Sequence, residues 1–303
     1  MHEVEILLAA HNGAAYVARQ IDSILAQSDG RWHLTLSDDG SQDGTKDILE
    51  AYARRWPGKI THHVSGRRFG CARDHFFYLI ARCEARYMML CDQDDVWLKD
   101  KVRLTLDALM ACGEETPALV FTDVTPADAQ LREIAPSLMA YQRMNPEKTE
   151  LRSLLLQNVV TGCAAGFNRA LAQIALECRD VQGVIMHDWW LAAAAARFGR
   201  IVYLPVSTAL YRQHGANSVG AKDAGSIAHI AERLAHPGRV RRAIMDKKRQ
   251  AQVFATTYAD RLDEADRAFI SGFSRRRSGP LFYWRHRKCV SGFFRLAGLM
   301  ALG

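Results

Sequence analysis

The sequence predicts an α/β fold with a mostly parallel sheet and a C-terminal α-helical extension. Between Val4 and Thr122, short apolar runs alternate with segments whose apolar residues recur every three or four positions. Strand–helix–strand alternation at this spacing is typical of βαβ units, which form parallel sheets. From about Asp223 the alternation stops, and a charged segment with helical spacing follows.

The expected strands are short apolar runs bounded by turn residues. They are Val4–Ala10, His33–Ser37, Lys59–Val64, Tyr87–Cys91 and Leu119–Thr122, with a further candidate at Ile201–Leu204. Helices are expected between them at Tyr16–Gln27, Thr45–Arg55, Asp74–Glu84 and Val96–Ala111. The proline- and asparagine-containing stretch Pro136–Pro146 is expected to be a loop, and the apolar run Leu191–Ala196 to lie in a buried helix.

Charge separates the chain into two predicted units, residues 1–222 and residues 223–303. The first contains 24 basic and 26 acidic side chains, and the second contains 16 basic and 7 acidic ones. The net charge of +7 therefore comes from the C-terminal unit. A protein that follows nucleic acid along its main domain needs Lys and Arg across the binding face, so no nucleic-acid partner is expected. The charge distribution still allows an anionic membrane surface as a partner, provided that it contacts only the C-terminal unit.

The sequence favours a cytoplasmic location. The seven cysteines are irregularly spaced and include no CxxC pair, so neither a zinc cage nor a disulfide framework is expected. No apolar stretch approaches the roughly 18 residues of a membrane-spanning helix. The segment Met1–Glu5 is acidic and does not resemble a signal peptide.

Acidic residues follow the expected strands at the points where these strands end. Asp38 and Asp39 follow the second strand, Asp92-Gln93-Asp94-Asp95 follows the fourth, and Asp123 follows the fifth. Ligands of an open parallel sheet bind outside the carboxyl ends of its strands. Carboxylates that converge there repel one another unless a cation lies among them. Oxygen ligands favour Mg²⁺ or Mn²⁺, which usually also bind substrate phosphates. These residues therefore predict a metal–diphosphate site.

At these residues the chain resembles a family 2 glycosyltransferase with the GT-A fold, a Rossmann-like sheet flanked by helices. Within that family it is most similar to the rhamnosyltransferase-like branch of bacterial surface-polysaccharide synthesis. The resemblance covers residues 3–222. It depends on six stretches in order: Leu8–Ile24, Ser37–Thr45, Leu90–Leu98 with its DQDDVW, Gln157–Asn168, His187–Trp190, which reads HDWW, and Tyr211–Gly220.

The resemblance implies a nucleotide-sugar site. Its residues would be Ala10, His11, Asn12, Asp38, Asp39, Arg73, Asp92, Gln93, Thr161, Gly162 and Arg212. One of Asp38 and Asp39 would accept a hydrogen bond from the pyrimidine ring N–H, for which an acceptor-only carboxylate is suited. Arg212 would pair with a phosphate oxygen. Gly162 would allow the backbone to approach the sugar closely.

The resemblance also implies which residues bind metal and perform the transfer. Asp94, in the DxD motif, and His214 would bind Mg²⁺ or Mn²⁺, which neutralises charge on the departing nucleoside diphosphate. Asp188 would be the general base that takes the proton from the acceptor hydroxyl. Trp189 and Trp190 would form an apolar wall for the acceptor, with the alternative that one or both are ordinary core aromatics.

The chain departs from the pattern of its relatives in three places. His187 precedes Asp188 where many relatives have Glu. Before the fourth strand, relatives often have Asn-x-Gly and a further Asn, where this chain has Arg68-Phe69-Gly70 and Asp74. The way in which this loop binds the nucleotide is therefore open. Asp95 either assists the metal site or caps the helix expected from Val96.

The leading hypothesis is a metal-dependent inverting glycosyltransferase that uses dTDP-L-rhamnose and a glycan or lipid-linked acceptor. A UDP-hexose-dependent member of the same family is the first alternative. A sugar-1-phosphate nucleotidyltransferase is a second, but the loop after Val4–Ala10 lacks a glycine-rich, basic signature for a triphosphate. The third is a non-catalytic carbohydrate-binding protein. The acid set Asp92, Asp94 and Asp188 argues against it, because clustered carboxylates are costly.

The end of the chain is basic and aromatic. In residues 281–303, Phe282, Tyr283, Trp284, Phe293 and Phe294 alternate with Arg285, Arg287, Lys288 and Arg295. A basic segment with aromatic residues can lie in the interface of an anionic bilayer. The segment is therefore expected either to contact the inner face of the cytoplasmic membrane or to pack on the protein itself or on a second subunit.

Overall fold

The computed structural model describes residues 2–215, 235–275, 278–291, 297 and 299–300 of the chain. The boundary predicted at residue 222, the end of the stretch Tyr211–Gly220 and the aromatic residues Phe293 and Phe294 lie outside the described residues. No helix of the described part combines the length and the apolar character that crossing a bilayer requires.

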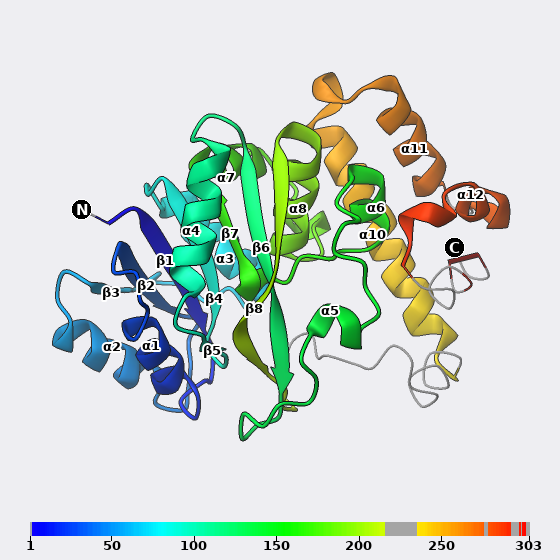
Figure 1. Cartoon of the computed structure of the whole chain (residues 1–303). Helices are drawn as coiled ribbons and strands as arrows, with labels where there is room; N and C mark the ends of the chain where they lie inside the picture. The colour runs from blue at the N-terminus through cyan, green and yellow to red at the C-terminus, as the bar shows by residue number, and fades with distance from the viewer. Residues whose placement is uncertain (1, 216–234, 276–277, 292–296, 298, 301–303) are drawn as a thin grey trace.

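An eight-stranded sheet lies at the centre of the molecule, in the order β3-β2-β1-β4-β7-β6-β8-β5 (Figure 1). Its strands are β1 (Val4–Ala10), β2 (Trp32–Asp38), β3 (Ile60–His63), β4 (Tyr87–Asp92), β5 (Val96–Trp97), β6 (Ala118–Ala127), β7 (Ala165–Asn168) and β8 (Arg200–Arg212). Strands β3, β2, β1 and β4 are parallel to one another, as are β6 and β8. Strand β7 is antiparallel to both of its neighbours. The predicted α/β class with a mostly parallel sheet is confirmed.

Helices cover both faces of the sheet. They are α1 (Val17–Leu25), α2 (Thr45–Arg55), α3 (Ala72–Arg82), α4 (Lys101–Cys112), α5 (Leu138–Tyr141), α6 (Leu151–Leu156), α7 (Arg169–Ala175), α8 (His187–Phe198), α10 (Pro237–Thr257), α11 (Glu264–Ser274) and α12 (Gly279–Arg285). Alternate residues of a strand point to opposite faces. In β1, Ile6 and Leu8 pack with α1, α2 and α4, whereas Leu7 packs with α3, α7 and α8. Both faces of β1 are therefore buried, as in a parallel sheet.

Two predicted segments contain a different kind of element in the structure, for identifiable reasons. The helix expected from Val96 begins at Lys101, because Val96 and Trp97 form a short strand that pairs with Leu210 and Ala209 of β8. The expected loop Pro136–Pro146 contains the short helix α5. Its N-cap Ser137 accepts a hydrogen bond from the backbone N–H of Ala140 at 3.0 Å, which satisfies one of the free amides of the first turn.

The C-terminal helices pack on the same hydrophobic core as α8. Phe254 and Tyr258, at the end of α10, are buried, and their ring centroids lie 5.4 and 5.8 Å from the indole of Trp190. Figure 1 shows α10 and α11 gathered beside α6 and α8. A helical C-terminal portion is therefore present, whereas the division into units 1–222 and 223–303 stays a prediction.

We expect Phe254→Ala to lower the free energy of unfolding by about 3–5 kcal/mol, because the substitution leaves a cavity against Trp190 in a close-packed core. Met245→Ala is the matched control on the same helix, since Met245 is 47% exposed, and it should change stability by less than about 1 kcal/mol. Denaturant unfolding of both variants measures the difference. Equal effects would mean that α10 does not share the core of the sheet.

Candidate active site

A cavity of about 480 Å³ opens at the carboxyl ends of β1 and β4. Strand pairing sets this position, because Ala10 lies beside Asp38 of β2 and Ala9 lies beside Asp92 of β4. The sequence-predicted residues that line the cavity are Ala10, His11, Asp39, Asp92, Gln93, Asp94, Thr161, Gly162, Asp188 and Trp189. The cavity therefore gathers residues that are up to about 180 positions apart in the chain, as expected for the ligand edge of a parallel sheet.

Gln93 joins the loops that follow β1 and β4. Its Oε1 accepts a hydrogen bond from the backbone N–H of His11 at 2.8 Å, and its Nε2 donates to the carbonyl of His11 at 2.9 Å. A Cβ at Gly13 would lie 2.1 Å from this Oε1, so any other residue there would displace the Gln93 carboxamide. The pair of hydrogen bonds fixes the base-binding edge predicted at His11 to the predicted metal-binding loop.

The two acids after β2 have different surroundings. Asp38 accepts hydrogen bonds from the backbone N–H of Gly40 and from the N–H and hydroxyl of Ser41, and it does not line the cavity. Asp39 is buried, lines the cavity, and accepts from the backbone N–H groups of Phe69 and Gly70. Asp38 thus stabilises its own turn, whereas Asp39 connects the cavity to the loop in which this chain departs from its relatives.

Asn12 also belongs to this turn rather than to the cavity lining. It has a left-handed backbone with φ 49°, which asparagine tolerates. Its backbone N–H donates to Ser41 Oγ at 2.8 Å, and its Oδ1 accepts from the backbone N–H of Gln42 at 2.9 Å. The side chain therefore connects the β1 and β2 loops.

The DxD acids Asp92 and Asp94 both line the cavity. Burial and the nearby Asp95 and Asp94 carboxylates raise the pKa of Asp92 well above its usual value. Asp94 Oδ2 lies 2.8 Å from Nε2 of His214, whose ring stacks on Tyr16 at 4.7 Å between centroids. Asp94 and His214, the two residues predicted to bind metal, therefore lie in direct contact. A carboxylate oxygen suits Mg²⁺ or Mn²⁺, and the added imidazole nitrogen favours Mn²⁺ over Mg²⁺.

Asp95 and Arg212 lie behind these acids. Asp95 is fully buried and accepts from the backbone N–H of Arg212 at 3.1 Å. Burial and the neighbouring Asp94 raise the pKa of Asp95 to about 7. The Arg212 guanidinium donates to the carbonyls of Asp94 and Ala129 at 2.6 Å each, and it lies 4.8 Å from the ring centre of Tyr16. Asp95 does not cap the helix predicted from Val96, because that helix begins at Lys101. Arg212 braces the DxD loop.

Asp188 lies in the first turn of α8, beside the 3-10 turn Gly162–Ala164. Burial raises the pKa of Asp188 to about 6, although the backbone N–H groups of Trp189 and Gly162 partly offset this effect. A Cβ at Gly162 would approach Asp188 Oδ2 to 3.5 Å and His187 Nε2 to 3.3 Å, so the glycine allows the loop to lie against both side chains. The result is a carboxylate that is ionised at neutral pH and still basic.

His187 is fully buried against Phe76, with ring centroids 4.2 Å apart. Burial lowers its pKa to about 3. The imidazole beside Asp188 is therefore neutral near pH 7 and does not provide a positive charge that would lower the basicity of Asp188.

The two tryptophans after Asp188 differ. Trp189 lines the cavity, and its Nε1 donates to the carbonyl of Leu154 at 2.5 Å. Trp190 is completely buried and donates to the carbonyl of Ala175 at 3.1 Å. The prediction that Trp190 contacts the acceptor is wrong, because successive positions of a helix point to different sides and the cavity takes only one of them.

Arg73 was predicted to bind the nucleotide-sugar, but it does not line the cavity. Its guanidinium donates to the Asp74 carboxylate, to the carbonyl of Val184 and to Oε1 of Gln182, at 2.7, 2.8 and 2.9 Å. Gln182 returns a hydrogen bond to Asp74 at 2.9 Å. This network fixes the start of α3 to the segment that precedes Asp188.

The sequence also missed part of the wall. Leu138, Gln142 and Met144, from the segment expected to be a plain loop, line the cavity together with Tyr211. Asp123, the acid that follows the fifth expected strand, accepts hydrogen bonds from Ser137 and from the backbone N–H groups of Leu138 and Met139, at 2.5, 3.1 and 3.3 Å. It fixes α5 at the cavity rim. In the sequence, the turn residues Pro136-Ser137 before the apolar pair Leu138-Met139 were the one feature that could have indicated a helix here.

Comparisons with known proteins identify the family of the chain. The profile described as Glycosyl transferase family 2 matches residues 5–174, which is more than half of the chain. The chain is 26% identical to the dTDP-rhamnosyl transferase RfbG of Shigella flexneri over 223 residues, which are 71% of this chain and 74% of RfbG.

Solved structures show the same fold. TarS of S. aureus in complex with UDP has a TM-score of 0.55 at 11% identity, with 100% of this chain and 90% of that chain covered. The mannosyltransferase PcManGT of Pyrobaculum calidifontis, in complex with GDP-Man and Mn²⁺, has a TM-score of 0.55 at 17% identity, with 99% and 78% covered. The predicted GT-A fold is confirmed, and the chain belongs to glycosyl transferase family 2 and is a glycosyltransferase.

Proposed function

We propose that this glycosyltransferase is metal-dependent and inverting, and that it transfers L-rhamnose from dTDP-L-rhamnose to a hydroxyl of a glycan or lipid-linked acceptor. One observation carries the proposal. Asp92, Asp94 and Asp188 line one cavity, and Asp188 is close enough to contribute to the raised pKa of Asp92. A metal-binding acid pair and a separate basic carboxylate on one cavity are what single-displacement sugar transfer requires.

Asp94 and His214 would bind the divalent ion, with Asp92 toward the ribose or the sugar. Mg²⁺ or Mn²⁺, when bound, supplies Lewis-acid stabilisation of the leaving nucleoside diphosphate. The Arg212 side chain donates a hydrogen bond to the backbone carbonyl of Asp94. This bond holds the loop, and with it the Asp94 carboxylate, in position and adds no further negative charge to the site. A bound cation would also relieve the repulsion among these buried acids. This supports a metal-binding role for the acids over a site that binds no ion.

Asp188 would take the proton from the attacking acceptor hydroxyl. Its pKa of about 6 leaves it deprotonated at pH 7 and more basic than an exposed carboxylate. Trp189 and Met144 supply apolar surface on the same cavity, and Gly162 lets its loop lie against Asp188. Since Trp190 is a core residue, the acceptor wall consists of Trp189 and the α5 segment.

The choice of donor depends on the likeness to RfbG, which is described as a dTDP-rhamnosyl transferase. His11 and Asp39 would contact the pyrimidine base, since both line the cavity beside the β1 edge. A UDP-sugar remains the alternative donor.

We also propose that the chain consists of two units, residues 1–222 and 223–303. The enzyme would be cytoplasmic and would contact the inner face of the membrane.

The membrane contact would use α12 and the residues after it. Tyr283 is buried and anchors this helix on the protein, whereas Leu281 is 78% and Trp284 is 53% exposed. Arg285, Arg287 and Lys288 follow at once. Exposed apolar side chains beside basic ones are typical of segments that lie in an anionic interface.

We expect Asp94→Asn to remove metal-dependent transfer and to weaken donor binding, because the amide is a poorer cation ligand than the carboxylate. Melting temperatures with dTDP-L-rhamnose and Mn²⁺ measure binding, since a ligand of the native state raises stability by mass action. Asp100→Asn, at the exposed start of α4, is the control. Full Mn²⁺-dependent activity of Asp94→Asn would exclude the metal assignment.

We expect Asp188→Asn to reduce transfer by about 10²–10⁴-fold, the usual contribution of a general base. Donor affinity should stay within a few-fold. In the unmodified enzyme, kcat/KM should fall as the pH drops below about 6, because protonation removes the base. Rates measured against pH test this, and near-normal transfer by the variant would place the base elsewhere.

The double variant Leu281→Ser/Trp284→Ser should bind anionic vesicles less well and keep its melting temperature, because both side chains are exposed. Met245→Ser, which removes an exposed apolar side chain from α10, serves as the control. Vesicle co-sedimentation and transfer to a water-soluble acceptor are measured together. Unchanged vesicle binding would show that α12 does not contact the membrane.

A further inference from the structure

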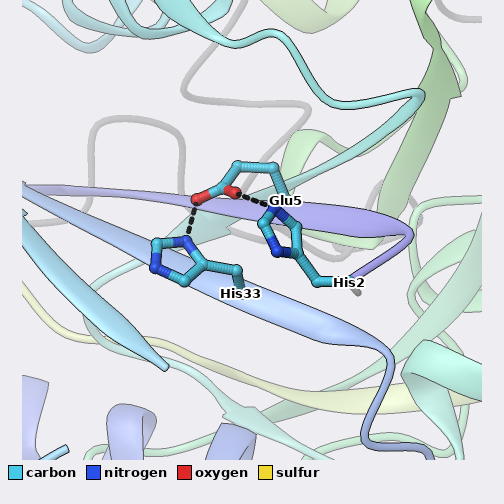
Figure 2. Close-up of side chains that lie close together, drawn as sticks. All are labelled: His2, Glu5 and His33. Atoms are coloured by element: carbon cyan, nitrogen blue, oxygen red, sulfur yellow. Dashed lines mark hydrogen bonds and ion pairs between the residues drawn. The ribbon is translucent and has the colours of Figure 1, made fainter. Parts of the chain in front are cut away.

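A second group of potential metal ligands lies at the amino end of β1, whereas the cavity lies at its carboxyl end. His2, Glu5 and His33 bring one ligand atom each to within 4.8 Å of one another (Figure 2). His33 Nδ1 lies 2.8 Å from Glu5 Oε1, and His2 Nε2 lies 3.5 Å from Glu5 Oε2. The two imidazole rings face each other with centroids 5.1 Å apart. None of these residues lines the active-site cavity.

Sheet register explains why two of these side chains meet. Glu5 of β1 is the direct partner of His33 in the parallel strand β2. Residues paired across adjacent strands point to the same face of the sheet. Glu5 is only 7% exposed, so its carboxylate needs partners. The strand pair therefore presents a preformed oxygen–nitrogen pair, and His2, three residues before Glu5, adds a second nitrogen from the start of the chain.

Two threonines hold this pair in place. Thr35 Oγ1 donates to Glu5 Oε1 at 2.7 Å, and Thr61 Oγ1 lies 3.1 Å from the far nitrogen of His33, Nε2. A ligating histidine generally forms a hydrogen bond with its other ring nitrogen, which fixes the tautomer and the ring orientation. His33 therefore points Nδ1 toward Glu5, while Thr61 already provides the hydrogen-bond partner of its Nε2.

We propose that His2, Glu5 and His33 bind a zinc-class transition metal ion. Two imidazoles and one carboxylate suit Zn²⁺, Co²⁺ or Ni²⁺ better than Mg²⁺, which prefers oxygen ligands alone. Metal–ligand bonds of about 2.1 Å in a tetrahedron place ligand atoms about 3.4 Å apart. His2 Nε2 lies 3.5 Å from Glu5 Oε2 and His33 Nδ1 lies 2.8 Å from Glu5 Oε1. The carboxylate therefore needs to turn so that one oxygen serves the ion, and the His33–Glu5 pair needs to open slightly. Water would complete the four-coordinate shell.

The site would fasten the start of the chain to β1 and β2. Because it lies at the far end of the sheet from Asp94 and Asp188, it would stabilise the fold without taking part in transfer. Its existence is independent of the proposed function. The competing explanation is a metal-free cluster in which the histidines only pair with Glu5.

The test titrates ZnCl₂ into the full chain, free of any histidine tag, in excess Mg²⁺ that saturates the acidic active site. Calorimetry should give one Zn²⁺ per chain, with a rise in melting temperature. Co²⁺ should give visible absorption bands of nitrogen-containing coordination. Absence of tight Zn²⁺ binding by the unmodified chain would overturn the proposal.

Matched variants locate the ion. His2→Gln changes a half-exposed side chain and should leave the fold intact while weakening Zn²⁺ binding by about tenfold or more. His33→Gln should do the same. His62→Gln is the control. His62 lies on β3 and pairs with Leu36, which belongs to the core on the other face of the sheet, so this variant should have no effect on Zn²⁺ binding. Asp94→Asn should also keep the Zn²⁺ affinity. Undiminished binding in His2→Gln, or loss in Asp94→Asn, would contradict the assignment.

Discussion

Repulsion among buried carboxylates is the constraint on which the active site depends. Burial and mutual proximity raise the pKa of Asp92 and Asp95 together. The fold offsets this cost with nearby hydrogen-bond donors. Arg212 donates its backbone N–H to Asp95, and His214 lies against Asp94. Beneath them Lys101 is completely buried and donates to Thr208 Oγ1 at 3.1 Å, and burial lowers its pKa to about 8.

This arrangement makes the site a shared product of several loops. Gln93 connects the β1 and β4 loops, Asp39 connects the β2 loop to Phe69 and Gly70, and Arg73 connects α3 to the segment before Asp188. None of these hydrogen bonds lies within one element. The cavity is therefore defined by side-chain-to-backbone hydrogen bonds that cross between loops, while the parallel strands fix only where the loops start.

The sequence predicted the regular elements well and the loops less well. Strand β1 and helix α2 have the predicted ends, because β1 is bounded by His11-Asn12-Gly13 and α2 by Gly44 and Trp56. Strand β7 was missed, since its four residues include Gly166 and carry little pattern. A Cβ there would lie 2.7 Å from the Thr105 side chain. The acids of the cavity were identified, because strand ends predict convergence.

The roles of Trp190, Arg73 and Arg212 could not be read from the sequence. Each depends on contacts made more than about a dozen positions away, with Ala175, Val184 and Ala129, respectively. Local spacing does not encode such contacts. The α5 wall was missed for the same reason, because Asp123 caps it from a distant strand.

Helix α8 has a second consequence, which concerns how the protein survives damage. Its first turn carries Asp188, and its buried side places Trp190 against Phe254 and Tyr258 of α10. A protease that cut the chain after β8 and released α10 would leave the Trp190 indole without the rings of Phe254 and Tyr258 that pack on it. Such a fragment would retain every acid of the cavity and yet present a sticky apolar surface of the kind that quality-control factors recognise.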